Sequence, residues 1–305
     1  MSIIFMGTPD FAVASLKALL EAGENVVAVV TAADKPAGRG QKLQQSAVKR
    51  YALEQDLPIL QPTNLKDPSF LAELKGYHAD LQVVVAFRML PEVVWDMPKK
   101  GTINLHASLL PQYRGAAPIN HAIINGEKES GVTTFLLQHE IDTGNILFSE
   151  KVAIEDNYTA GDLHDQLMNV GAKLLVKTVS ALKDNKVTGI PQVANSGYLK
   201  AAPKIHKEDC RIDWSKSSNN VYNFIRGLSP YPTAFTKLNG KILKIFKATL
   251  LFELPDIPAG DYKSDGKSFL YYACPDGYID VKVLQLEGKK KMDISDFLRG
   301  YRVKQ

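Results

Sequence analysis

The sequence predicts an α/β protein of two domains, in which a doubly wound, mostly parallel sheet is followed by a smaller, OB-like β-barrel. Three observations support this prediction. Strand-sized apolar segments alternate with amphipathic helical segments over residues 1–187, as in Rossmann-like sheets that carry helices on both faces. Residues 188–206 contain turn-forming residues without a helical period and predict a linker. Residues 207–305 alternate short strands with tight turns, the pattern of a small barrel.

The N-terminal elements show the alternation most clearly. Ile3–Met6 is a short apolar strand. Thr8 is the expected N-cap of the following helix, with Pro9 at the first helical position, and Gly23 is expected to end that helix. Val26–Val30 is apolar throughout, as a parallel strand that is covered on both faces requires.

The remaining elements continue this order. Helices are predicted over residues 49–56, 69–75 and 161–185, and strands over residues 59–60, 81–87 and 101–106. In the second domain, Asn239-Gly240 and residues 275–277 predict the turns of two hairpins. The strand predicted after the second turn begins by alternating apolar and polar residues, which indicates burial on one face.

Composition excludes several classes of protein. The apolar fraction of 45% and the charged fraction of 23% are typical of a globular chain, and no segment approaches the about 20 apolar residues of a membrane span. The N-terminus does not resemble a signal peptide, and two isolated cysteines indicate a reducing compartment. We therefore expect a cytoplasmic protein that does not bind membranes. The six histidines show no metal-ligand spacing, so no metal is expected.

Positive charge is concentrated in two parts of the chain. The net charge is +4, and residues from Lys204 onward contain 18 Lys and Arg against 12 Asp and Glu. A basic second domain suggests a polyanionic partner, although lysines that only keep a small barrel soluble would give the same count. Residues 31–46 form a second basic segment, far longer than the usual about 2–6 residues between strand and helix. Such a loop is either functional or a flexible, solvated segment.

An amide, an imidazole and a carboxylate form the most informative candidate site. Asn104 and His106 lie two residues apart in a predicted strand, so their side chains point to the same face. Pro111 ends this strand, and Asp142 ends an apolar stretch that is expected to reach the same edge of the sheet. Such a trio suits acyl transfer to an amine, because it offers an oxyanion donor, a proton carrier and a group that orients the imidazole. An Asn-x-His pair is also common as a plain polar strand end.

Seven motifs spread over nearly the whole chain resemble those of the methionyl-tRNA formyltransferases, a family within the 10-formyltetrahydrofolate-dependent formyltransferases. Asn104–Pro118 and Ile141–Gly144 resemble the two signatures of the wider superfamily. The other five motifs are Gly7–Phe11, Asp34–Gly40, Arg211–Trp214, Ile225–Pro232 and Gly288–Met292. Gly7–Phe11 also lacks the later glycines of a dinucleotide-binding turn, which disfavours a nicotinamide-dependent dehydrogenase.

The resemblance implies an enzyme of translation initiation. It would transfer the formyl group of 10-formyltetrahydrofolate, a cosubstrate, to the free amino group of methionine on initiator tRNA. Asn104, His106 and Asp142 would be its catalytic residues, and the resemblance leaves open whether His106 or Asp142 is the base. We expect a monomer.

The resemblance also implies two sets of binding residues. The folate would contact Ser108, Leu109, Leu110, Pro111, Phe87, Arg88, Met89, Leu90, His139, Glu140 and Ile141. Phe87 and Arg88 replace the more common Tyr-Gly of the family, so the pterin contacts stay open. The tRNA would contact Lys35, Arg39, Lys42, Lys289, Lys290 and Lys291.

Several other activities are alternatives. Formylation of glycinamide ribonucleotide, formylation of a sugar amine and hydrolysis of formyltetrahydrofolate use the same kind of catalytic domain. The basic loop and the barrel-like second domain disfavour all three. An RNA-binding protein with a decayed catalytic domain is disfavoured by the presence of Asn104, His106 and Asp142.

Overall fold

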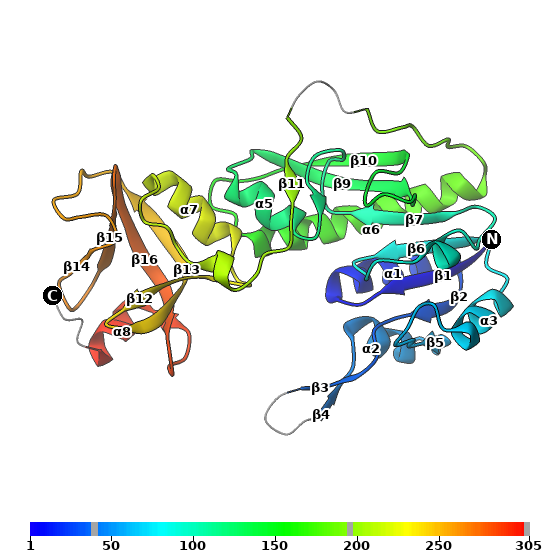
Figure 1. Cartoon of the computed structure of the whole chain (residues 1–305), viewed down its shortest axis with the longest axis horizontal. Coiled ribbons are helices and arrows are strands. Elements are labelled where there is room, and N and C mark those ends of the chain that lie inside the picture. The colour runs from blue at the N-terminus through cyan, green and yellow to red at the C-terminus, as the bar shows by residue number, and fades with distance from the viewer. Residues whose placement is uncertain (38–41, 194–197, 302–305) are drawn as a thin grey trace. The chain divides into compact units, whose positions relative to one another are not determined.

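The structure, a computed structural model, describes residues 1–37, 42–193 and 198–301, and its chain divides into two units (Figure 1). The first unit comprises residues 1–115, 131–152 and 164–201. The second unit comprises residues 116–130, 153–163 and 202–305. Two short segments near the middle of the sequence, residues 116–130 and 153–163, therefore belong with the C-terminal part of the chain.

A seven-stranded sheet forms the centre of the first unit. Its strand order is β10 (Ile146–Ala153), β9 (Glu129–Leu136), β7 (Thr102–His106), β6 (Leu81–Val85), β1 (Ser2–Gly7), β2 (Asn25–Val30) and β5 (Ile59–Leu60). The strands from β7 to β5 pair in parallel, and β9 runs antiparallel to β7. The predicted doubly wound, mostly parallel sheet is confirmed.

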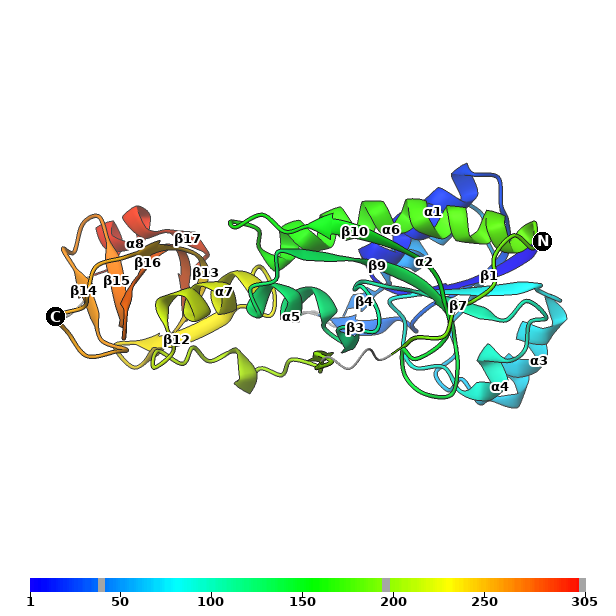
Figure 2. The same ribbon diagram turned by 90° about the horizontal axis from the view of Figure 1, so that it is seen from above.

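Helices cover both faces of this sheet (Figure 2). One face carries α1 (Asp10–Glu21) and α6 (Ala160–Lys183), and the other carries α3 (Pro68–Gly76) and α4 (Glu92–Trp95). The remaining helix of the unit, α2 (Ala47–Glu54), begins after Ser46, whose hydroxyl accepts a hydrogen bond from the Lys49 N–H.

Alternation along the strands decides which side chains meet which helices. Ile4 of β1 and Val84 of β6 belong to the buried cluster that contains Phe70 of α3 and Val94 of α4. Successive side chains of a strand point to opposite faces, so the intervening residues pack under α1 and α6. Both faces are apolar for this reason, as the sequence of β2 and β6 predicts.

Two small sheets lie outside the main one. β3 (Lys35–Ala37) pairs antiparallel with β4 (Lys42–Gln44), and β8 (Arg114–Gly115) pairs with β11 (Ala201–Ala202). The long basic loop after β2 is therefore a two-stranded ribbon over its described residues.

A curled antiparallel sheet forms the second unit. Its order is β12 (Ala234–Leu238), β13 (Lys241–Leu251), β16 (Gly277–Leu286), β15 (Leu270–Cys274) and β14 (Tyr262–Ser264), and β17 (Met292–Asp293) pairs with β16. The helices of this unit are α5 (Pro118–Ile124), α7 (Ser218–Gly227), α8 (Ile294–Gly300) and the 3-10 helix η1 (Glu208–Cys210). Among the described residues the edge strands β12 and β14 do not pair, so the expected OB-like barrel is a half-barrel.

Arg226 on α7 ties the early segments to this half-barrel. Its guanidinium is buried, donates from Nη1 to the Tyr158 carbonyl at 2.9 Å and donates from Nε to Asn223 Oδ1 at 2.8 Å. Asn120 on α5 donates to the Gly227 carbonyl at 2.7 Å. Burial holds the pKa of Arg226 below its ordinary value. Arg226, a residue of the Ile225–Pro232 motif, thus links α7 to the segment that contains Tyr158.

The structure confirms the predicted hairpin turn at Asn239-Gly240 but shifts the boundaries of two predicted elements. Asn239 and Gly240 have φ angles of 49° and 78°, as the predicted hairpin turn requires. The first helix begins at Asp10 with Pro9 as its N-cap, so the assignment of Thr8 as the cap is wrong. Strand β6 ends at Val85, earlier than predicted, because Ala86 turns the chain with a φ of 47°.

Candidate active site

Strand β7 presents Asn104 and His106 on the face of the sheet that α6 does not cover. Asn104 is in parallel register with Val84, which packs in the cluster that contains residues of α3 and α4. Leu105 points the other way, against Gly171 of α6. His106 is buried and Asn104 is half-buried. Within the part of the chain that the structure describes, no hydrogen bond occupies the Asn104 amide, so its N–H groups are available to a substrate.

The His106 ring is oriented by a backbone carbonyl. Its Nε2 lies 2.9 Å from the Tyr113 oxygen. Because a carbonyl only accepts, Nε2 carries the hydrogen in this bond. Nδ1 is then the ring nitrogen that can take up a proton, and it lies 3.9 Å from Asp142 Oδ2. That separation is too long for a direct hydrogen bond, but a polar group placed beside both atoms can bridge them.

Asp142 reaches His106 by a route that differs from the expected one. Strand β9 is antiparallel to β7, and Leu136 at its end pairs with Ile103 at the start of β7. Asp142 does come to the end of β7 where His106 lies, as expected. It arrives there because the loop of residues 137–145 folds back over the sheet, and not because β9 itself ends at that edge. There the Asp142 carboxylate accepts a hydrogen bond from the Gly115 N–H at 3.0 Å.

The turn after β7 is fixed by Thr133, which the sequence did not single out. The Thr133 hydroxyl donates to the Ser108 carbonyl at 2.7 Å and accepts from the Leu110 N–H at 3.2 Å. Ser108 Oγ in turn donates to the Gln112 carbonyl at 2.7 Å. These bonds set the direction of the Tyr113 carbonyl. Thr133 belongs to none of the sequence motifs. Its role could not be predicted, because it depends on β9 lying beside β7.

The predicted folate residues lie in three loops. Phe87–Leu90 follow β6 and Ser108–Pro111 follow β7, and because these strands are parallel neighbours, both loops leave the same edge of the sheet. His139–Ile141 belong to the loop between β9 and β10. Met89 and Ile141 are 73% and 59% exposed, so each presents apolar surface that a ligand can cover.

Two polar members of this set, Arg88 and His139, already have partners in the protein. Arg88 donates to the carbonyls of Pro62 and Thr63, the latter at 2.9 Å. The His139 Nε2 lies 3.7 Å from a Glu92 carboxylate oxygen. The Arg88 guanidinium therefore ties the loop after β6 to the backbone of Pro62 and Thr63. These bonds use part of its hydrogen-bonding capacity within the protein.

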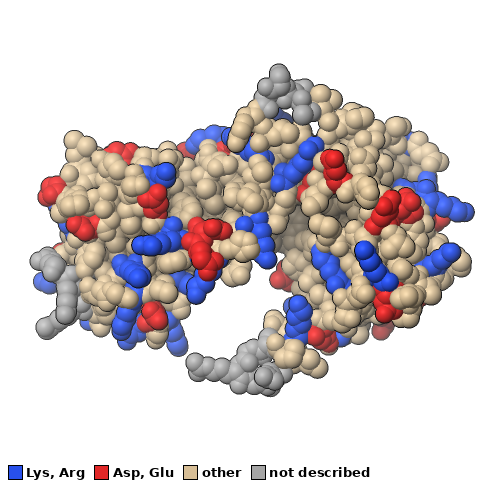
Figure 3. Space-filling view, viewed as in Figure 1, with Lys and Arg blue, Asp and Glu red and all other residues tan. Residues whose placement is uncertain are grey.

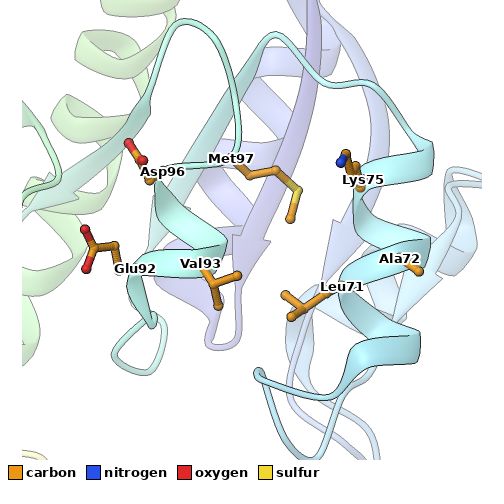
Figure 4. Close-up of a pocket in the computed structure, with 7 residues that line it drawn as sticks. All are labelled: Leu71, Ala72, Lys75, Glu92, Val93, Asp96 and Met97. Atoms are coloured by element: carbon orange, nitrogen blue, oxygen red, sulfur yellow. The ribbon is translucent and has the colours of Figure 1, made fainter.

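A surface hollow of about 490 Å³ lies elsewhere in the first unit. Figure 4 shows its apolar floor between α3 and α4, with charged groups at its sides. Its lining consists of Leu71, Ala72, Lys75, Glu92, Val93, Asp96 and Met97. None of the predicted catalytic or folate residues lines it, so we do not assign it to the formyl donor.

Comparison with known families decides the class of this protein. A family described as formyl transferase matches residues 1–179, and the formyl transferase C-terminal domain matches residues 204–302. The chain belongs to the formyl transferase family.

Two relatives match the sequence of this formyl transferase over nearly its whole length. The chain is 54% identical to the methionyl-tRNA formyltransferase of Bacteroides thetaiotaomicron, over 99% of the chain and 96% of the relative. It is 53% identical to that of Flavobacterium johnsoniae, over 98% of the chain and 96% of the relative.

Solved structures agree with the fold. A sugar 3N-formyl transferase, determined in the presence of dTDP and 5-N-formyl-THF, has a TM-score of 0.68 at 22% identity and covers 95% of this chain and 99% of its own. A methionyl-tRNA formyltransferase from Clostridium thermocellum has a TM-score of 0.57 at 16% identity, with coverages of 82% and 93%. At these identities the likeness supports the fold alone.

The basic ribbon of this formyl transferase is anchored at its base. Lys49 of α2 pairs with the Asp34 carboxylate at 2.6 Å, and Gln61 donates to the same carboxylate at 2.8 Å. These two bonds hold the pKa of Asp34 below its ordinary value. Lys35 is an exposed residue of β3. Lys42 belongs to β4, and Arg39 lies outside the described residues.

The other predicted tRNA contacts lie in the second unit. Lys289, Lys290 and Lys291 are exposed in the turn between β16 and β17. Lys291 Nζ lies 4.5 Å from the centre of the Phe246 ring, a cation–π contact. In Figure 3, Lys and Arg gather over the part of this unit where α8 and the β16–β17 turn lie.

The remaining candidates for a reactive centre are metal-ligating side chains and the two cysteines. Over residues 1–37, 42–193 and 198–301 no cluster of three or more His, Cys, Asp or Glu side chains could hold a metal ion. Cys210 and Cys274 are both buried and unpaired, and burial raises the pKa of the Cys274 thiol to about 12. Among the described helices, none is long and apolar enough to cross a membrane.

Proposed function

We propose that this protein transfers the formyl group of 10-formyltetrahydrofolate to the amino group of methionine on initiator tRNA, in the cytoplasm and as a monomer. The observation that carries the proposal is the arrangement on β7 and its neighbouring loop. There the free amide of Asn104 and the buried ring of His106 share one face, and Asp142 lies 3.9 Å from that ring. The relatives at 53–54% identity, which are named methionyl-tRNA formyltransferases, support the choice of acceptor.

Asn104 stabilises the transition state in this scheme. The neutral amine attacks the formyl carbon, and the formyl oxygen becomes an oxyanion. The Asn104 amide donates a hydrogen bond to that oxyanion, as oxyanion-hole donors do. The formyl group is already activated on the folate nitrogen, so no covalent enzyme intermediate is needed.

His106 and Asp142 handle the proton. Nε2 of His106 is held by the Tyr113 carbonyl, so the proton leaves the attacking amine toward Nδ1 or toward the Asp142 carboxylate that faces it. The same proton passes to N10 of the folate as the carbon–nitrogen bond to the donor breaks. The products are formylmethionyl-tRNA and tetrahydrofolate, and the protein returns to its starting protonation state.

The three predicted folate loops are assigned to the donor. In our proposal Ser108–Pro111 and Phe87–Leu90 contact the folate from the strand-end edge, and His139–Ile141 contact it from the loop that carries Asp142. Exposed Met89 and Ile141 supply apolar surface, which a planar ring can cover.

One assay separates this function from its rivals. We expect formyl transfer to charged initiator tRNA to be far faster than transfer to charged elongator methionine tRNA, glycinamide ribonucleotide, a sugar amine or water. Initial rates with each acceptor at a fixed donor concentration measure this preference. Faster transfer to a small amine than to charged initiator tRNA would replace the proposed acceptor.

Arg39→Ala is expected to lower kcat/KM for initiator tRNA by about tenfold, the effect of losing one charge-assisted hydrogen bond. Slow hydrolysis of formyltetrahydrofolate, where it is measurable, should be unchanged. Lys66→Ala, which removes an exposed charge elsewhere on the first unit, is the matched control. Equal losses of transfer and hydrolysis would assign Arg39 to the folate site or to the fold.

Replacing Lys289, Lys290 and Lys291 with alanine is expected to flatten the salt dependence of tRNA binding. Each lost phosphate contact reduces the log–log slope by about 0.7–0.9, so the triple variant changes it by at most about 2–3. Lys291 already contacts the Phe246 ring, so it is less available to a phosphate. We therefore expect the slope to change by less than this maximum.

Binding measured at several salt concentrations tests this role. A triple variant of Lys17, Lys66 and Lys75, all exposed on the first unit, removes the same charge and should keep the wild-type slope. If the two triple variants have the same slope, the β16–β17 turn makes no phosphate contacts.

A further inference from the structure

Gln192 lies in the segment that the sequence predicts as a linker, yet its side chain is built into the loop that carries Asp142. Its Nε2 donates to the carbonyl oxygens of Asp142 at 2.9 Å and Gly144 at 2.8 Å. Its Oε1 accepts from Arg114, from Nε at 3.2 Å and from Nη2 at 2.6 Å. A primary amide has two hydrogens and two lone pairs to offer, and Gln192 uses all of them here.

The loop it holds has an unusual backbone. Asp142 has a φ of 54°, a left-handed conformation that few residues other than glycine adopt. A Cβ atom on Gly144 would lie 1.6 Å from the Leu136 carbonyl oxygen, so the chain passes close to its own β9 strand. The two carbonyls that Gln192 binds flank Thr143, and their fixation sets the turn from which the Asp142 side chain projects.

Arg114 decides which way the Gln192 amide points. A guanidinium only donates hydrogen bonds, so Oε1 must face Arg114 and Nε2 must face the loop. Gly115, the next residue, donates its N–H to Asp142 Oδ2 at 3.0 Å. Strand β8 therefore holds Asp142 at two points, by its carboxylate through Gly115 and by its backbone through Arg114 and Gln192.

The segment that carries Gln192 is itself attached to the sheet. The backbone groups of Ile190 and Ile146 exchange two hydrogen bonds of 2.8 Å at the start of β10. A Cβ atom on Gly189 would lie 2.7 Å from Asn145 Cβ, so this segment runs close against the end of the loop. The backbone that carries Gln192 is thus held in place against the sheet.

We propose that Gln192 and Arg114 are positioning residues that fix the Asp142 carboxylate beside Nδ1 of His106. The inference rests on the proposed function, because it gives Asp142 a role in moving the proton. Neither residue needs to touch a substrate. A misplacement of about 1 Å at a reacting group can cost about 10²-fold in rate, and the loss of the Gln192 contacts releases the backbone that carries Asp142.

Two variants of Gln192 test whether its hydrogen bonds, and not only the size of its side chain, are needed for catalysis. Gln192→Met keeps the length of the side chain and removes all its hydrogen bonds. Gln192→Glu keeps the shape and adds a charge pair with Arg114, but its second oxygen then faces the carbonyls of Asp142 and Gly144. We expect kcat to fall about 10- to 10²-fold in Gln192→Met, and at least as far in Gln192→Glu. Val193→Ala, at the exposed neighbouring residue, should keep wild-type kcat.

A double-mutant cycle tests whether Gln192 acts through Asp142. Residues that work as one unit give non-additive losses. The variant that combines Gln192→Met with Asp142→Asn should therefore be no slower than Asp142→Asn alone, within about twofold. Losses that multiply, or a Gln192→Glu variant as active as the wild type, would overturn the positioning role.

Hydrogen exchange makes the test independent of the reaction. In the full chain without substrate, the backbone amides of residues 141–145 should exchange faster in Gln192→Met than in Val193→Ala, while the amides of β7 stay protected. Equal exchange in the two variants overturns the inference whatever the activity. A wild-type protein that does not formylate initiator tRNA overturns the proposed function instead, so the two failures are distinguishable.

Discussion

Replacing Asn104 with alanine is expected to lower the kcat of formyl transfer about 10²–10³-fold, as the loss of other oxyanion donors does. The reason is visible in the ground state, where the Asn104 amide has no hydrogen-bond partner among the described residues. Its donors are therefore used in the transition state, when the oxyanion forms. The measurement is single-turnover formylation of charged initiator tRNA at saturating folate.

The stability of the same variant provides its control. Truncation of Asn104 leaves no protein group without its partner, so the free energy of unfolding should change by about 1 kcal/mol or less. Asn104→Asp should be at least as slow as Asn104→Ala, because a carboxylate would repel the oxyanion. Normal turnover in a folded Asn104→Ala variant would remove this residue from the mechanism.

Local sequence patterns predicted most of the fold. The apolar β2 strand, the two-residue spacing in β7 and the Asn239-Gly240 turn each act through neighbours in the sequence, and the structure confirms each of them. The faces of the strands follow from alternation alone. Boundaries were less predictable, because Ala86 ends β6 through its backbone conformation and carries no side-chain signal.

The arrangement of the candidate site depends on contacts between distant segments. Asp142 lies near His106 because β9 runs antiparallel to β7 and its loop returns over the sheet, and periodicity does not encode strand direction. Thr133 and Gln192 act on residues 25 and 50 positions away. Polar residues with such long-range partners look like ordinary surface residues in the sequence, and the turn-rich surroundings of Gln192 favoured the interpretation as a linker.

Replacing Asp142 with asparagine is expected to lower kcat about 10²-fold or more, within the range that proton-transfer groups contribute. The substitution preserves size, and its amide oxygen can still accept the hydrogen bond of the Gly115 N–H. It removes the negative charge that faces Nδ1 of His106 at 3.9 Å. The His106 ring then gains a proton without a nearby counter-charge, so proton removal from the amine becomes harder.

The pH dependence of kcat distinguishes this role from a structural one. We expect the kcat of Asp142→Asn to stay low at every pH at which the wild type is active, because no change of pH restores the missing carboxylate. Asp96→Asn, at an exposed carboxylate directly after α4, should reproduce the wild-type profile and rate. The KM for tRNA should change much less than kcat, since Asp142 acts on the reacting proton and not on the tRNA backbone. A folded Asp142→Asn variant with an unchanged pH profile and a near-normal kcat would exclude the carboxylate from proton transfer and leave His106 as the only base at the site.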